Sequence, residues 1–149
     1  IHLVEDQEVN DLTKSILFAH RSGYRDVLIL GATGMREDHT LGNISLLMEH
    51  AYLFRRIEML SDYGLFTPLM KTATLMSRPG IQVSLFSLSP SGTLSASGLR
   101  WPISDRMLTA WWQGTLNEAT GDSFTVTLSP EARVLVYRTL SVPDKETVR

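Results

Sequence analysis

The chain has 149 residues, of which 14 are Lys or Arg and 16 are Asp or Glu, so its formal net charge is −2. A charge this close to zero offers no basic surface for a phosphate backbone and argues against a nucleic-acid-binding protein. The 43% share of apolar residues excludes an intrinsically disordered chain. The absence of cysteine excludes disulfides and thiolate sites and favours the cytoplasm. No apolar run approaches the roughly 18 residues that span a bilayer, so no membrane partner is expected.

The first 60 residues have the pattern of an α/β structure. Apolar residues recur at helical spacing after Asn10, a residue suited to a helix N-cap, and Gly23 is expected to end this helix. Residues 26–31 form a continuous apolar run that predicts a strand buried on both faces. A second helical stripe runs from about residue 41 to residue 51, with Asp38 or Thr40 as its N-cap. Helix, strand and helix in this order predict a parallel sheet.

Beyond residue 60 the helical spacing disappears and short alternating segments take over. Residues 83–88, 123–128 and 133–138 read as strands, and residues 90–92, 120–122 and 129–131 read as turns. The region 61–141 is therefore predicted to be an all-β unit, a sandwich or a rolled sheet, and residues 142–149 a frayed tail. Acidic residues outnumber basic ones in residues 1–60, whereas the two are nearly balanced afterwards.

A first polar cluster precedes and opens the first helix. It contains Asp6, Gln7, Asp11 and Lys14, and the last two lie one helical turn apart on the same side. One interpretation is a capped helix start whose carboxylates face the positive end of the helix dipole. The density of carboxylates exceeds what a cap needs, which favours a functional role.

A second cluster, residues 31–43, follows the predicted strand directly and opens the second helix. In an open α/β sheet, ligands bind at the carboxyl ends of the strands, and a glycine-bearing loop that leads into a helix presents donors suited to phosphate. Arg36 could pair with phosphate oxygens and Asp38 could hold a divalent ion. The alternative is a tight turn with Asp38 as a helix cap. Neither the dinucleotide-binding nor the Walker A pattern is present.

A third cluster is aromatic and lies in the β region. Trp101 next to Pro102 could stack on a flat ring whose edge would meet Asn117 and Glu118. Core packing is the commoner fate of a tryptophan in a small β domain. Trp111 and Trp112 would face opposite sides of a strand, so only one of them could point inwards.

These clusters, in this order, resemble the thiamine pyrophosphokinase family over residues 6–137. That family carries Asp-Gln and then Asp and Lys on a helix, a Gly-x-x-Gly-x-Arg-x-Asp-His…Asn segment after a strand, and a β domain with Gly-Leu-Lys/Arg-Trp and a later Ser-Asn-Glu. The matching positions here are Asp6-Gln7, Asp11, Lys14, Gly31, Gly34, Arg36, Asp38, His39, Asn43, Gly98-Leu99-Arg100-Trp101 and Asn117-Glu118.

The chain also departs from the family pattern. Asn10 stands where the family usually has Thr, Met35 where it commonly has a second Gly, Glu37 where it has an apolar residue, and Leu116 where it has Ser. The family's amino-terminal portion, with a Gly-Asp-x-Asp-Ser motif, has no counterpart in this chain. We therefore expect a partial α/β catalytic domain over residues 1–60, with part of it missing before Ile1, and a β-sandwich-like thiamine-binding domain over residues 61–141.

The resemblance implies transfer of a diphosphate group from ATP to thiamine, with Mg²⁺. It implies catalytic roles for Asp11, Asp38 and Arg36, with the two aspartates as metal ligands. It assigns ATP to Gln7, Lys14, Gly34, Thr40 and Asn43, and thiamine to Ser97, Trp101 and Asn117. It also implies a homodimer in which the β domain of one subunit completes the site of the other. The alternatives are another ATP-dependent phosphotransferase on an α/β scaffold, or a non-catalytic ligand-binding protein whose carboxylates are only caps.

Overall fold

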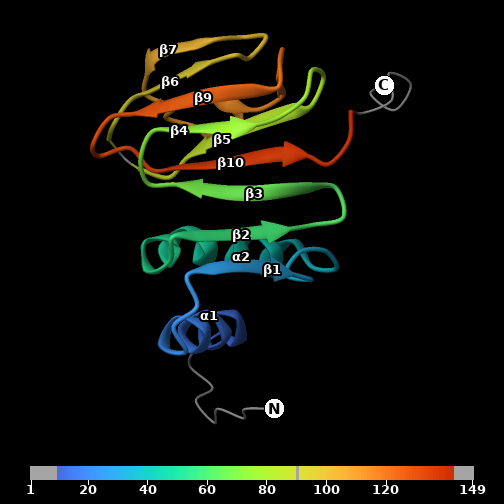
Figure 1. Ribbon diagram of the computed structural model, residues 1–149, viewed down its shortest axis with the longest axis vertical. Helices are drawn as coiled ribbons and strands as arrows, with labels where there is room; N and C mark the ends of the chain where they lie inside the picture. Colours follow the sequence, from blue (N-terminus) through green and yellow to red (C-terminus); the bar gives the residue numbers. More distant parts are fainter. Residues whose placement is uncertain (1–9, 90, 143–149) are drawn as a thin grey trace. The chain divides into compact units, whose positions relative to one another are not determined.

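The computed structural model describes residues 10–89 and 91–142 and divides into two compact units, Ile1–Ser61 and Asp62–Arg149 (Figure 1). Asp6, Gln7 and Pro90 lie outside the described residues, as does all of the predicted tail except Val142.

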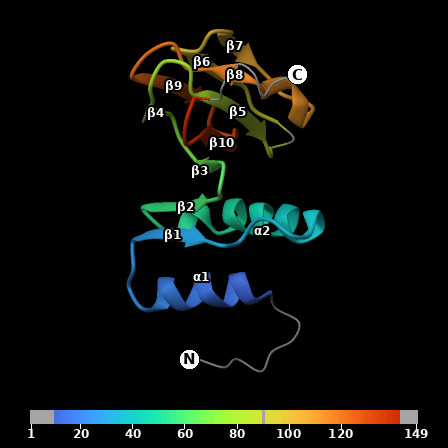
Figure 2. The ribbon, with the colours of Figure 1, turned by 90° about the vertical axis from the view of Figure 1, so that its right-hand side faces the viewer.

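The first unit is a strand–helix–strand arrangement preceded by a helix. Its elements in chain order are α1 (Asp11–Arg21), β1 (Asp26–Leu30), α2 (Glu37–Glu49), the short 3₁₀ helix η1 (Ala51–Leu53) and β2 (Arg56–Leu60). β1 and β2 pair in parallel, from Asp26 opposite Arg56 to Leu30 opposite Leu60. Figure 2 shows α2 lying alongside the two strands, as a crossover between parallel strands requires. The predicted parallel α/β structure is confirmed.

Helix α1 begins and ends where the sequence predicts. The Asn10 side chain accepts a hydrogen bond from the backbone N–H of Leu12 at 2.8 Å, which satisfies one of the free donors of the first turn. At the other end Gly23 adopts a φ of +84°, and its N–H donates to the carbonyl of His20 at 3.0 Å. This left-handed residue stops the helix at low steric cost because glycine has no Cβ.

Two local predictions for this unit are wrong. Helix α2 starts at Glu37, so Asp38 and Thr40 lie inside its first turn and neither caps it. Strand β1 is not buried on both faces: Ile29 is buried, but Leu28 and Leu30 are 53% and 65% exposed. Side chains alternate across a strand, and the elements described here cover only the face that carries Ile29.

The second unit consists of two antiparallel sheets. One contains β3 (Gly64–Leu69), β10 (Val134–Thr139), β5 (Gln82–Ser87) and β8 (Asn117–Glu118), in that spatial order. The other contains β4 (Ala73–Met76), β9 (Ser123–Leu128), β6 (Leu94–Ser97) and β7 (Ile103–Arg106). A 3₁₀ helix, η2 (Trp111–Gly114), precedes β8. The three strands predicted from the sequence correspond to β5, β9 and β10 within one residue at each end.

The core of the second unit lies between inward-facing residues of both sheets. Val83 and Leu85 of β5 and Val134 and Val136 of β10 are fully buried, as is Val126 of β9. The alternation of buried and exposed positions along these strands is that of a sheet packed on one face. The predicted β-sandwich-like domain is confirmed, so the chain as a whole is α/β plus all-β.

Candidate functional site

The loop between β1 and α2 is tied to the helix that follows it. The N–H of Gly34, which has a φ of +94°, donates to the hydroxyl of Thr40 at 3.1 Å, and that hydroxyl donates to the carbonyl of Arg36 at 3.1 Å. The amide nitrogen of Asn43 donates to the carbonyl of Ala32 at 2.8 Å. Three residues expected to contact ATP, namely Gly34, Thr40 and Asn43, therefore hold the loop to the first two turns of α2 here.

Arg36 and Asp38 form a bidentate ion pair at the start of α2. The Arg36 Nε lies 3.1 Å from Asp38 Oδ1 and its Nη2 lies 2.5 Å from Oδ2. Hydrogen bonds from the Arg36 guanidinium and then from the His39 backbone N–H lower the pKa of Asp38 below its usual value. Both side chains are exposed, so this pair contributes little to stability and is accessible to phosphate or a cation.

Asp11 and Lys14 form a similar pair on the first turn of α1. The Lys14 Nζ lies 3.2 Å from Asp11 Oδ1, and the Asp11 side chain is 98% exposed. The two aspartates predicted to bind metal are thus each paired with a basic residue two or three positions away in the chain. Within residues 10–89 and 91–142, no three His, Asp or Glu side chains lie close enough together to hold a metal ion. Gln7 falls outside the described residues.

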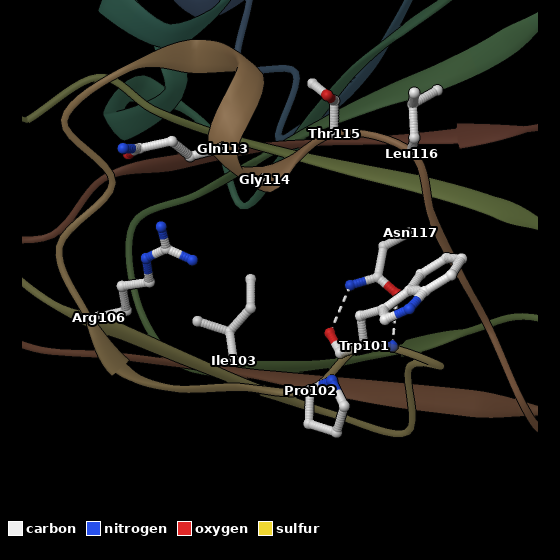
Figure 3. A pocket seen from close by; sticks show the side chains of 9 residues that line it. All are labelled: Trp101, Pro102, Ile103, Arg106, Gln113, Gly114, Thr115, Leu116 and Asn117. Carbon is white, nitrogen blue, oxygen red and sulfur yellow. Dashed lines mark hydrogen bonds between the residues drawn. The ribbon is translucent and has the colours of Figure 1, made fainter.

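The second unit contains a cavity of about 230 Å³ beside Trp101 (Figure 3). Its walls come from β7 and the segment that enters it, from η2, and from β8 and the turn before it. The residues that line it are Trp101, Pro102, Ile103, Arg106, Gln113, Gly114, Thr115, Leu116 and Asn117. Two of the three residues predicted to bind thiamine, Trp101 and Asn117, therefore meet at one cavity.

Asn117 holds the backbone of Trp101 from both sides. Its Oδ1 accepts from the Trp101 N–H at 3.1 Å and its Nδ2 donates to the Trp101 carbonyl at 2.6 Å (Figure 3). The same Oδ1 also accepts from the Glu118 N–H at 2.9 Å. Asn117 is 5% exposed and lies in β8, opposite Val83 of β5, so the clamp stands on a paired strand. Because the Asn117 amide makes these three hydrogen bonds within the protein, Asn117 acts as a positioning residue for Trp101.

The Trp101 ring itself is available to a ligand, because 55% of the residue is exposed. The Arg100 guanidinium carbon lies 5.1 Å from the centroid of the ring, and the guanidinium is paired with Glu118 at 3.5 Å. The core-packing alternative for Trp101 is therefore wrong. The ring is held at the surface by backbone hydrogen bonds and by a neighbouring cation.

Ser97, Trp111 and Trp112 lie elsewhere. Ser97 ends β6, opposite Thr125 of β9, and does not line the cavity. The two tryptophans belong to η2, where both are exposed, so the expectation that a strand would turn one of them inwards is wrong. Adjacent residues on a short 3₁₀ turn do not alternate between two faces as strand residues do.

Sequence reasoning missed Ile103, Arg106 and Gln113 as cavity residues. Ile103 and Arg106 belong to β7, which pairs with β6 through a bulge between Leu94 and Ala96. The Gln113 Oε1 accepts from the backbone N–H of Thr109 at 2.8 Å and thus shapes the turn into η2. None of the three belongs to a motif, and only tertiary pairing brings them to Trp101.

Within the part of the chain that the structure describes, no helix combines the length and the hydropathy that a transmembrane span requires.

The comparisons with known families and proteins agree with one another. Residues 1–60 match the family model described as thiamin pyrophosphokinase, catalytic domain, and residues 64–137 match the one described as thiamin pyrophosphokinase, substrate-binding domain. Thiamine pyrophosphokinase 1 of Arabidopsis thaliana is 35% identical over 67% of this chain, and thiamine pyrophosphokinase 2 of Oryza sativa subsp. japonica is 37% identical over 67% of it. The chain covers 41% of each of these relatives, about two fifths of their length.

Solved structures share the fold. The thiamin pyrophosphokinase of Geobacillus thermodenitrificans has a TM-score of 0.77 at 24% identity and covers 91% of this chain, which covers 64% of it. The thiamine pyrophosphokinase of Bacillus subtilis has a TM-score of 0.79 at 19% identity. The matched region covers 90% of this chain and 64% of the Bacillus subtilis chain. At these identities the likeness supports the fold alone.

Proposed function

The chain belongs to the thiamin pyrophosphokinase family, and from this premise we propose that the protein transfers a diphosphate group from ATP to thiamine, with release of AMP. The observation that carries the proposal is that one chain matches both the catalytic and the substrate-binding halves of the family. The Trp101 cavity lies within the segment that matches the substrate-binding half.

In the proposed reaction, the hydroxyethyl oxygen of thiamine attacks the β-phosphorus of ATP. A bond forms between that oxygen and the β-phosphorus, while the bond from the β-phosphorus to the oxygen bridging it to the α-phosphorus breaks. AMP leaves with the bridging oxygen, and the proton of the alcohol passes to a base. Such transfers are accelerated mainly by positioning and by neutralising charge on the phosphate oxygens.

This chain has residues that could position the nucleotide and residues that could neutralise the charge of its phosphates. We assign Arg36 and Lys14 to the charge of the phosphates, because Arg36 directly precedes α2 and Lys14 lies in the first turn of α1. Gly34, Thr40 and Asn43 define the loop that receives the nucleotide. Asn43 and Thr40 act in this proposal by fixing the backbone of the loop.

Asp11 and Asp38 fit the magnesium ion that accompanies ATP. Mg²⁺ keeps several waters and is bound by one or two carboxylates together with substrate phosphates, so two exposed carboxylates suit it without an all-protein cage. The bound ion would supply charge neutralisation at the phosphates. The low pKa of Asp38 keeps its carboxylate ionised and able to bind a cation.

Trp101 is proposed to stack on the pyrimidine of thiamine, since its ring is exposed beside the cavity. Ser97 lies at the end of β6 and does not line the cavity. In this proposal it contacts the part of thiamine that extends beyond the cavity. A homodimer whose site is completed across the interface, and a cytoplasmic location, are further parts of the proposal that rest on the family resemblance and on the cysteine-free composition.

The activity is tested by incubating the protein with ATP, Mg²⁺ and thiamine and separating the products. We expect thiamine diphosphate and AMP in equal amounts. ADP together with thiamine monophosphate would instead identify a single-phosphate transferase, and binding of thiamine without any product would favour a ligand-binding protein.

The role of Trp101 is tested by Trp101→Ala. Losing the stacking surface is expected to raise the KM for thiamine about tenfold and to change the KM for ATP less than about twofold. Trp112→Ala is the matched control, because Trp112 is exposed but does not line the cavity. Equal effects on both substrates would contradict the assignment.

A further inference from the structure

A second cavity in the β-sandwich-like unit has no part in the proposed reaction. Its volume is about 350 Å³, compared with about 230 Å³ for the cavity beside Trp101, and the two cavities share no lining residue. It lies where the ends of β4 and β10 meet the starts of β3 and β5. Its lining side chains are apolar at Leu65, Met76, Ile81 and Leu140 and cationic at Arg78 and Arg138.

The Arg138 guanidinium is fixed in the wall of this cavity by the protein. Its Nη1 donates to the Met76 carbonyl at 2.7 Å, and its Nη2 donates to the Thr67 hydroxyl at 3.2 Å. Thr67 is buried in β3, and Arg138 lies opposite Leu65 in the ladder between β10 and β3. These contacts fix the position of one positive charge at the cavity.

Arg78 contributes the second cation from a short hydrogen-bonded turn between β4 and β5. The turn runs from Arg78 through Pro79 and Gly80 to Ile81, and the Ile81 N–H donates to the Arg78 carbonyl at 3.2 Å. Proline at the second position and glycine with a φ of +88° at the third are typical of a type II turn. The Gly80 N–H also donates to the Ala119 carbonyl at 2.9 Å, which ties the turn to the residue after β8.

The Arg78 side chain is exposed, and its charge is available to a ligand. Within residues 10–89 and 91–142, no group forms a hydrogen bond or an ion pair with its guanidinium. Asp122 contacts the neighbouring Ser77 through its backbone carbonyl, which accepts from the Ser77 N–H at 2.8 Å. No residue that lines the cavity is acidic. The cavity therefore favours an anion and disfavours a cation such as thiamine.

We propose that this cavity binds a phosphate monoester with an apolar body. Guanidinium groups present planar, bidentate donors that match phosphate oxygens, and a phosphate monoester carries nearly two negative charges at pH 7. The cavity is larger than a phosphate group requires, and Leu65, Ile81 and Leu140 form much of its remaining wall. An apolar body would gain affinity by covering these side chains. The inference is independent of the proposed function, because none of these residues is assigned to ATP or thiamine.

The test is an NMR titration of backbone amides, which reports affinity and location together. The probes are phenyl phosphate, inorganic phosphate, phenol and thiamine, each added without ATP. Phenyl phosphate should shift the signals of Gly80 and Thr139 and leave the Trp101 indole signal unchanged. Inorganic phosphate should bind about tenfold more weakly, because it lacks the apolar body. Phenol and thiamine should shift neither Gly80 nor Thr139.

Arg78→Met removes one charge and no hydrogen bond within the described structure, so the variant is expected to fold. It should weaken phenyl phosphate about tenfold. Lys71→Met is the matched control, because it changes the net charge equally at an exposed residue of the same unit that does not line the cavity; it should change the affinity less than about twofold. Leu140→Ser should weaken phenyl phosphate about threefold and leave inorganic phosphate unchanged.

Three results would overturn the inference. One is that phenyl phosphate shifts no signal at Gly80 or Thr139. Another is that Arg78→Met and Lys71→Met weaken binding equally, which would identify general electrostatic attraction. The third is that phenol or inorganic phosphate binds as tightly as phenyl phosphate. Failure of the proposed function is separate, because an Arg78-dependent titration would persist in a protein that transfers no diphosphate.

Discussion

Replacing Asn117 tests the claim that this residue positions Trp101. Asn117→Ala removes an amide that makes three hydrogen bonds, two to Trp101 and one to the Glu118 N–H, at a site that is 5% exposed. Each lost bond costs about 1 kcal/mol when its partner can reach water and more when it cannot. The free energy of unfolding should therefore fall by about 2–4 kcal/mol.

The stability assay is urea unfolding followed by circular dichroism. With an m-value of about 1–2 kcal/mol/M for a small domain, the midpoint should fall by roughly 1–4 M. Thr115→Ala is the control, because it removes a single hydrogen bond beside the same cavity, from an exposed hydroxyl to the Trp112 carbonyl. A loss below about 0.5 kcal/mol for Asn117→Ala would refute the clamp.

Asn117→Asp separates the donor of the clamp from its acceptor. The ionised carboxylate still accepts from the two N–H groups, but it faces the Trp101 carbonyl oxygen without a hydrogen to donate. Protonation restores that donor. Burial raises the pKa of a carboxyl group, so ligand affinity and Trp101 fluorescence should recover as the pH falls, even before ligand is added. Trp111→Phe with Trp112→Phe leaves Trp101 as the sole tryptophan reporter. A fluorescence signal independent of pH in this background would contradict the clamp.

Three further perturbations concern other parts of the chain. Asn10→Ala removes the cap of α1 and should lower the free energy of unfolding by about 1 kcal/mol, measured by thermal or urea unfolding; Asn10→Asp should retain it. Gly98→Ala should cost about 2 kcal/mol or more, because a Cβ at φ +78° would lie 2.9 Å from the Ser123 carbonyl oxygen; an unchanged midpoint would contradict this. Arg36→Met should raise the pKa of Asp38 toward its usual value, measured by NMR titration of the carboxyl group. The pKa of Asp38 is lower in the folded protein than in the unfolded chain, so its pairing with Arg36 stabilises the fold above the usual carboxyl pKa. This stabilisation is lost as the pH falls through the lowered pKa. The corresponding dependence of stability on acid pH should therefore be smaller in Arg36→Met.

Local signals in the sequence predicted the elements well, and tertiary contacts account for the errors. Asn10 and Gly23 act within one turn of their own positions, so the ends of α1 could be inferred from spacing alone. The burial of β1 depends on which neighbours cover each face, and an apolar run carries no information about that.

The candidate site was predictable only where motifs carried it. Trp101 and Asn117 were named from motifs that lie 16 residues apart, and they meet at one cavity. Arg106 was not found because its position depends on the pairing of β7 with β6 across a bulge. The clamp role of Asn117 was also missed, because the hydrogen-bonding capacity of an amide can be assigned only once its partners are known.

The ties between the β1–α2 loop and its helix have a consequence for the thermodynamics of ligand binding. Hydrogen bonds from Asn43 to Ala32 and from Gly34 to Thr40 fix the loop at two points. A phosphate arriving there would meet a preorganised backbone, so little conformational entropy would be lost on binding. The main adjustment would be at the exposed ion pair, where Arg36 would leave Asp38 and pair with the phosphate. Affinity at this loop should therefore depend strongly on ionic strength and only weakly on loop ordering.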